Sequence, residues 1–142
     1  KGAKDGVKPR MGVVCGTGIV GIVSQVTDNY AVVMSVLNSK SSISCRLRGS
    51  RYFGYLHWHG GNVLCATLDD IPRHANFKLG DAVETSGFSN VFPPGIFVGR
   101  IIQIRDSRDG LSYQLMVQLS SDLANVRDVA VILNDHDSDI IP

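Results

Sequence analysis

The stretch V-G-I-V-S-Q-V at residues 20–26 returns as V-G-R-I-I-Q-I at residues 98–104, so that both copies follow the pattern V-G-x-[VI]-x-Q-[VI]. A second apolar segment precedes each copy, at residues 7–14 and 77–84. A turn and then another strand-like segment with a tyrosine near its start follow each copy. Self-similarity that extends over several segments predicts two similar structural units within one chain.

The rest of the chain has the pattern of short strands. Valine, isoleucine, tyrosine and phenylalanine cluster in runs that Gly, Asn, Asp, Ser or Pro separate, which is typical of strands and tight turns. We expect strands at residues 18–27, 30–37, 42–48, 51–57, 62–68, 81–85, 96–105, 111–119 and 127–133. The fold is therefore predicted to be all-β with little or no helix, as two small packed β-barrels of the six-stranded type related by the duplication. Residues 135–142 are predicted to form a disordered acidic tail.

The charge and cysteine content exclude several classes of function. With 14 Lys+Arg against 13 Asp+Glu, the formal net charge is +1, which argues against binding to nucleic acid or to an anionic membrane surface. No apolar run approaches the roughly 18 to 20 residues that span a bilayer. Cys15, Cys45 and Cys65 lack the close spacing of a zinc or redox site, so we expect them to be small buried side chains. The alternative is one disulfide bond, whose two cysteines the sequence does not assign. No cofactor is expected.

Several motifs together resemble a known family. T-S-G at residues 85–87, F-P-P-G at 92–95 and V-G-R at 98–100 follow one another in order, and K-G-A-K-D-G-V opens the chain. With G-I-V-G at 18–21 and D-I-P at 70–72, the sequence resembles the MreC family of rod shape-determining proteins across residues 1–133. It departs from the family at Arg10, where a glycine usually precedes the methionine.

The resemblance implies a non-catalytic scaffold of the bacterial cell-elongation machinery, which maintains rod shape during peptidoglycan synthesis. It implies a periplasmic or otherwise extracytoplasmic location, with the membrane reached only through an N-terminal anchor upstream of this chain. The implied partners are the class B penicillin-binding transpeptidase of elongation, MreD, MreB across the membrane and further MreC copies. It also implies one β-barrel at residues 14–86, inserted into a second that combines residues 1–13 with 87–134.

The aromatic segment from Arg51 to His59 is the best candidate for a partner-binding surface. Strand alternation places Phe53, Tyr55, His57 and His59 on one face, and Leu56 with Trp58 on the other. If the Leu56 face fills a barrel, the four other side chains form an aromatic patch of the kind enriched at interfaces. The alternative is that a neighbouring barrel or an upstream helix covers them.

Other readings remain open beside this one. His57 and His59 could share a metal only with a third ligand such as Asp69, Asp70 or His74. A hydrolase that resembles a serine protease would need Ser86, which lacks a G-x-S-x-G motif. A module that only self-assembles is the third possibility.

We interpret a further set of residues as structural, at turns and strand bulges: Gly21, Gly87, Pro93, Pro94, Gly95 and Gly99.

Overall fold

The computed structural model describes residues 1–88 and 90–133. The elements in chain order are the 3-10 helix η1 (Ala3–Asp5) and the strands β1 (Gly12–Cys15), β2 (Gly18–Val26), β3 (Ala31–Ser35), β4 (Ile43–Leu47), β5 (Phe53–His57), β6 (Cys65–Pro72), β7 (Ala82–Thr85), β8 (Phe97–Asp106), β9 (Ser112–Leu119) and β10 (Ala130–Val131). Apart from the single turn of η1, these described elements are all strands, which confirms the all-β prediction.

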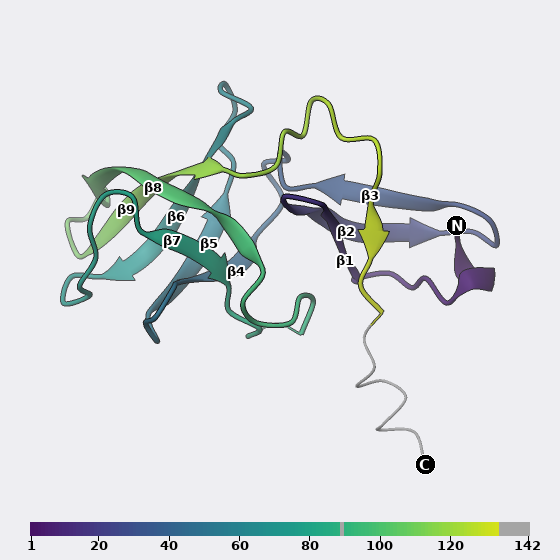
Figure 1. The fold of residues 1–142 in the computed structure, drawn as a ribbon. Coiled ribbons are helices and arrows are strands. Elements are labelled where there is room, and N and C mark those ends of the chain that lie inside the picture. The colour runs from purple at the N-terminus through teal and green to yellow at the C-terminus, as the bar shows by residue number, and fades with distance from the viewer. Residues whose placement is uncertain (89, 134–142) are drawn as a thin grey trace, which may run out of the picture.

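Six of the strands close into a barrel in the order β4-β5-β6-β9-β8-β7. Figure 1 shows this barrel as one half of the molecule, with β7, β8 and β9 crossing in front of β5 and β6. Alternate residues of the strands point inward, and Leu56, Leu68, Ile101, Leu115 and Val117 are buried almost completely. Branched aliphatic side chains therefore fill the barrel interior, which leaves the opposite faces of the strands for solvent or partners.

The other half is a four-stranded sheet in the order β10-β1-β2-β3. One face of this sheet packs on the barrel, since Ile19 and Val36 belong to the same buried cluster as the barrel interior. On the other face, Val13 and Val23 form a smaller cluster with Val7 and Met11. The first core joins the two halves, which lie side by side in Figure 1.

The internal duplication is visible in the strand pairing. β1-β2-β3 and β7-β8-β9 are both antiparallel meanders, with register shifts after Val13 in one copy and after Val83 in the other. The pairing of the second strand with the third shows another shift in each meander, between Val23 and Gln25 of β2 and between Ile101 and Gln103 of β8. Both copies therefore carry two bulges at matching places.

The structure corrects the expected division of the chain. The predicted second barrel is a four-stranded sheet that does not close among the described strands, while the other unit is the closed six-stranded barrel. The boundaries expected at 14–86 and at 1–13 with 87–134 differ from the pairing, because β2 and β3 pair with β1, and β7 to β9 join β4 to β6. The expected tail at 135–142 lies outside the described residues.

Candidate partner-binding surface of the barrel

Strand β5 presents the predicted aromatic patch on the outside of the barrel. Gly54 and Leu56 are buried, whereas Phe53 is 37% exposed and Tyr55 and His57 are partly exposed. The alternation arises because β5 pairs with β4 on one side and with β6 on the other, so its inner face is fixed by the barrel core. His59 follows the strand and is exposed. The patch therefore keeps one uncovered face within the described residues.

Phe88 extends this patch, although it lies outside the segment from which the patch was predicted. Its ring stacks on that of Phe53, with 5.2 Å between the ring centroids and 22° between the planes, and Phe88 is 67% exposed. Phe53 also meets Tyr55 edge to face at 6.3 Å. Such offset and edge-on contacts are the favoured arrangements of aromatic rings. We call Phe53, Tyr55, His57, His59 and Phe88 the aromatic row.

The two histidines of the row are held by polar contacts of their own. His57 Nδ1 lies 3.2 Å from the carbonyl oxygen of Ser41. His59 Nε2 lies 2.8 Å from Thr67 Oγ1 and 3.7 Å from an oxygen of Asp69. Among residues 1–88 and 90–133, no group of three His, Cys, Asp or Glu side chains is placed to hold a metal ion. The contacts orient the rings at the end of the row.

Charged residues continue the same outer face around the barrel. The cross-strand pairing sets Phe53 opposite Arg46, Arg46 opposite Glu84, and Glu84 opposite Phe97. The carboxylate of Glu84, whose side chain is 7% exposed, accepts hydrogen bonds from Arg46 Nε at 2.8 Å and Arg48 Nε at 2.6 Å. Burial acts to raise the pKa of Glu84, but these hydrogen bonds and the two positive charges outweigh it and bring the pKa below its ordinary value.

Ser86 and its motif have a structural environment. Ser86 Oγ lies 2.7 Å from Ser44 Oγ, and each of the three described histidines makes its contacts elsewhere. Neighbouring Thr85 is fully buried, donates to the carbonyl oxygen of Pro93 and accepts from the N–H of Ile96. The motif thus ties β7 to the loop before β8 and offers no histidine base to Ser86 within the described chain.

The glycines and prolines of the repeat lie where backbones approach closely. A Cβ at Gly21 would overlap the carbonyl oxygen of Met34, and one at Gly99 would overlap that of Gln118. Gly87 has φ +77° and faces the ring of Pro94, and Gly95 has φ +93°. Pro93 accepts the Thr85 bond described above. These contacts lie at turns or between paired strands, where they constrain the course of the backbone.

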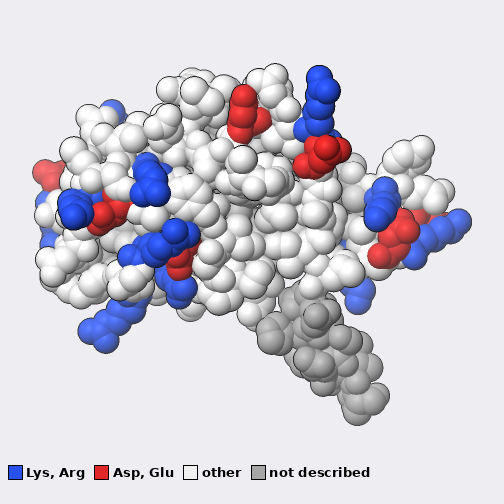
Figure 2. All heavy atoms as spheres, in the orientation of Figure 1, with Lys and Arg blue, Asp and Glu red and all other residues white. Residues whose placement is uncertain are grey.

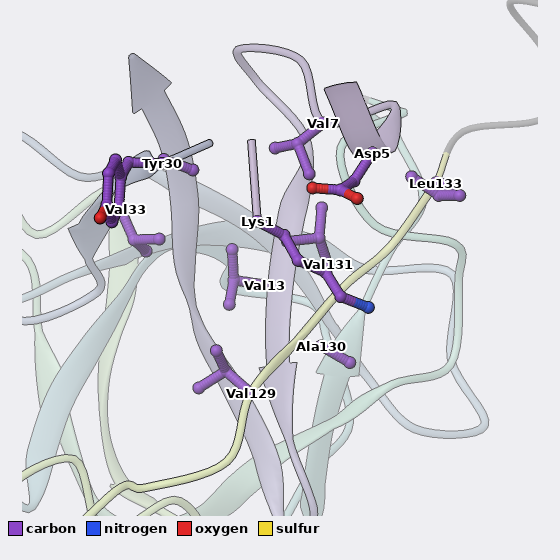
Figure 3. Close-up of a pocket in the computed structure, with 11 residues that line it drawn as sticks. Lys1, Asp5, Val7, Val13, Tyr30, Val33, Val129, Ala130, Val131 and Leu133 are labelled. Atoms are coloured by element: carbon purple, nitrogen blue, oxygen red, sulfur yellow. The ribbon is translucent and has the colours of Figure 1, made fainter. Parts of the chain in front are cut away.

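A groove lies on the face of the four-stranded sheet that points away from the barrel. Its volume is about 710 Å³. Figure 3 shows Val13 between the side chains of Tyr30 and Val33 on one side and Val131 on the other. The remaining lining residues are Lys1, Asp5, Val7, Ala31, Val129, Ala130 and Leu133. The groove is mostly apolar and is separate from the aromatic row.

The protein family of this chain follows from its similarity to known families. The sequence matches the family "Rod shape-determining protein MreC, barrel core" over residues 1–133, which is nearly the whole chain. The chain belongs to the MreC family. The resemblance inferred from the motifs is thereby confirmed, and with it the assignment to a family of cell shape-determining proteins.

Individual MreC relatives agree with this assignment. The MreC protein of Listeria monocytogenes is 31% identical over 135 residues, which cover 93% of this chain and 46% of that protein. An MreC structure from Listeria superposes with a TM-score of 0.86 at 30% identity, covering 92% of this chain and 64% of that one. The chain spans about half the length of the curated relatives it matches.

Two further MreC structures share the fold. One is described as the major periplasmic domain from the cell shape-determining filament MreC, with a TM-score of 0.72, 26% identity and coverage of 90% of this chain and 78% of that one. The other is described as a complex between Penicillin-Binding Protein (PBP2) and MreC from Helicobacter pylori. It shares the fold, with a TM-score of 0.67 at 23% identity over 85% of this chain and 75% of that one. No described helix of the present chain is long and apolar enough to cross a membrane.

Proposed function

We propose that this chain is the barrel core of a scaffold in the bacterial cell-elongation machinery, which acts outside the plasma membrane and binds the class B transpeptidase of elongation without chemistry of its own. The observation that carries the proposal is the aromatic row, an uncovered line of rings on the outside of a rigid barrel. Rigid aromatic side chains supply contact area at low entropic cost, and they dominate the energetics of many interfaces. The complex of a Helicobacter pylori MreC with PBP2 supports this choice of partner.

Membership of the MreC family supports the remaining parts of the proposal. The elongation transpeptidase, MreD, MreB across the membrane and further MreC copies are the partners we propose for the complete protein. The periplasmic location is proposed because a related MreC domain is described as periplasmic. Membrane attachment through a segment upstream of residue 1 belongs to the same proposal.

The test is a binding measurement with the purified transpeptidase of the same organism. The double variant Phe53→Ser/Tyr55→Ser should weaken binding by about tenfold or more, since loss of interface aromatic rings costs about 2 kcal/mol at hot spots. Leu111→Ser is the matched control, because Leu111 is 76% exposed at the turn between β8 and β9. Equal affinities of the wild type, the double variant and the control would remove the aromatic row from the interface.

Self-assembly is a second candidate, and the edge of the four-stranded sheet favours it. β3 pairs only with β2 among the described strands, and its sequence A-V-V-M-S holds no charge or proline that would protect the edge. Val32 on this strand is 56% exposed. Sedimentation at increasing concentration should show larger species for the wild type and a monomer for Val32→Lys. A monomeric wild type would contradict assembly through this edge.

A further inference from the structure

Three arginines lie side by side on the outside of the barrel, next to the aromatic row. Arg46 and Arg48 belong to β4 or directly follow it, and Arg100 belongs to β8. Together with Glu84 on β7, which lies between β4 and β8, and with Phe97 on β8, they form what we call the arginine cluster. It adjoins the aromatic row directly, since Arg46 is the cross-strand partner of Phe53. Figure 2 shows several basic side chains on the barrel half of the molecule, with acidic ones beside some of them.

The cluster holds its guanidinium groups in fixed positions. Arg46 and Arg48 are tied to Glu84 by ion pairs of 2.7 and 2.6 Å. Arg48 and Arg100 both lie over the ring of Phe97, with 5.2 and 5.5 Å from the guanidinium carbon to the ring centroid. Arg100 Nη1 also donates to the carbonyl oxygen of Gly80 at 3.0 Å. Arginines held in this way lose little conformational entropy when they bind a further group.

The cluster keeps donors and charge that the described chain does not use. Glu84 occupies the Nε atoms of Arg46 and Arg48, but the terminal nitrogens of Arg48 and Arg100 Nη2 have no hydrogen-bond partner among the described residues. Three arginines against one carboxylate leave two positive charges in excess. The whole chain has a net charge of only +1, so this excess is local.

We propose that the arginine cluster is the second half of the docking surface and receives a segment of the partner protein that presents at least two carboxylates. Guanidinium groups match carboxylates as planar, paired donors, and arginine with aromatic residues is the combination enriched at protein interfaces. Arg48 and Arg100, which lie over the ring of Phe97, supply the charged side of the surface, and Phe53 and Phe88 supply the apolar side. The inference rests on the proposed function only in taking the transpeptidase as the partner.

A protein segment fits the cluster better than a polyanion. Nucleic acids and similar polymers are bound by long basic stripes that neutralise many phosphates in succession. Here the excess charge is confined to three neighbouring strands, β4, β7 and β8, and it is flanked by aromatic rings. A short protein segment that carries acidic residues next to apolar ones would match both the confined positive charge and the flanking aromatic rings.

The first arm of the test needs no transpeptidase. A short poly-L-glutamate peptide is titrated into the isotope-labelled protein at low salt while the arginine Nε–H resonances are followed by NMR. The resonances of Arg48 and Arg100 should shift, and that of Arg108 should not, since Arg108 is exposed in the turn after β8 and has no ion pair in the described part of the chain. Absent shifts, or equal shifts at Arg108, overturn the inference. So does a stronger response to polyphosphate than to poly-L-glutamate.

The second arm measures the affinity for the transpeptidase. Arg48→Gln/Arg100→Gln should weaken binding by about tenfold and reduce its salt dependence, while Arg108→Gln leaves both unchanged. If the wild type binds and the double variant binds equally well with the same salt dependence, the cluster is not part of the docking surface, although the proposed function stands. If the wild type does not bind, the proposed function fails, and the first arm alone decides whether the cluster is a carboxylate site.

Discussion

Arg10 occupies the position in the first meander that Gly80 occupies in the second, and both adopt a left-handed backbone, with φ of 73° and 90°. The N–H of Arg10 donates to the carbonyl oxygen of Val23 at 2.7 Å, and the N–H of Gly80 donates to that of Ile101 at 2.8 Å. The turn before each meander therefore has one geometry, although only one copy has the residue that adopts it without strain.

From this relationship we predict that Arg10→Gly stabilises the protein. A side chain in the left-handed region costs about 1–2 kcal/mol, of which the greater freedom of glycine in the unfolded chain offsets a part, so the gain should be about 0.5–1 kcal/mol. Gly80→Ala is the matched control and should destabilise by a similar amount, because space around its Cβ is open and only the backbone opposes it. Chemical denaturation checks both, and a less stable Arg10→Gly variant would contradict the argument.

The two repeat glycines should tolerate no side chain. Gly21→Ala and Gly99→Ala would each press a methyl group on a carbonyl oxygen of the neighbouring strand, which should cost about 1–3 kcal/mol or more. Gly16→Ala, where no atom lies within 4 Å and φ is not positive, should leave the stability almost unchanged. Melting temperatures measured by circular dichroism compare the three variants. A neutral Gly99→Ala would show that β8 and β9 can separate at this point.

Glu84 should contribute to the dependence of stability on pH. Because the pKa of Glu84 is lower in the folded than in the unfolded chain, its contribution is present above the ordinary pKa of 4.5 and is lost as the pH falls through the folded value. Glu84→Gln should cost about 1–2 kcal/mol at pH 7, since the arginines are partly exposed. The variant should also lose less stability than the wild type between about pH 5 and 3. The free energies of unfolding of both proteins are measured by chemical denaturation at each pH. A difference between wild type and Glu84→Gln that stays constant with pH would contradict this. Asp128→Asn, at an exposed carboxylate, is the control.

The three cysteines should differ in reactivity. All three are free thiols. Slight burial acts to raise the pKa of Cys15, but hydrogen bonds with Thr17, Ser121 and the backbone lower it to about 7. Burial raises the pKa of Cys45 well above its usual range. Iodoacetamide at pH 7 should therefore modify Cys15 first and leave Cys45 unmodified in the folded protein. Peptide mass mapping gives the order, and early modification of Cys45 would contradict its position inside the barrel.

Local patterns predicted the strands better than they predicted the arrangement of strands. The alternation in β5 is a property of consecutive residues, so the outward direction of Phe53 and Tyr55 could be inferred from the sequence. No strand was expected at β1, and β6 was expected to end at Leu68. It continues to Pro72 through a bulge at which Asp70 has φ 68°.

The boundaries of the two units and the extent of the surface depended on pairing between distant strands. Glu84 of β7 reaches Arg46 of β4 across 38 positions of sequence, and Phe88, after the end of β7, stacks on Phe53 of β5. The duplication suggested two alike units, but one copy continues into a closed barrel, whereas the other pairs with the two residues of β10. A run of apolar residues predicts a strand but does not specify which other strand it pairs with.

The short pairing of β10 with β1 also determines how the molecule would carry a mechanical load. Val13 lies opposite Val131 and Val14 opposite Ala130, so the segments before the meander and after the barrel meet in one sheet. Figure 1 shows the barrel outside the line that joins them. A pulling force applied to residues 1 and 133 would run through the β1–β10 contact and bypass the closed barrel. The aromatic row and the arginine cluster would then keep their geometry while the sheet bears the load.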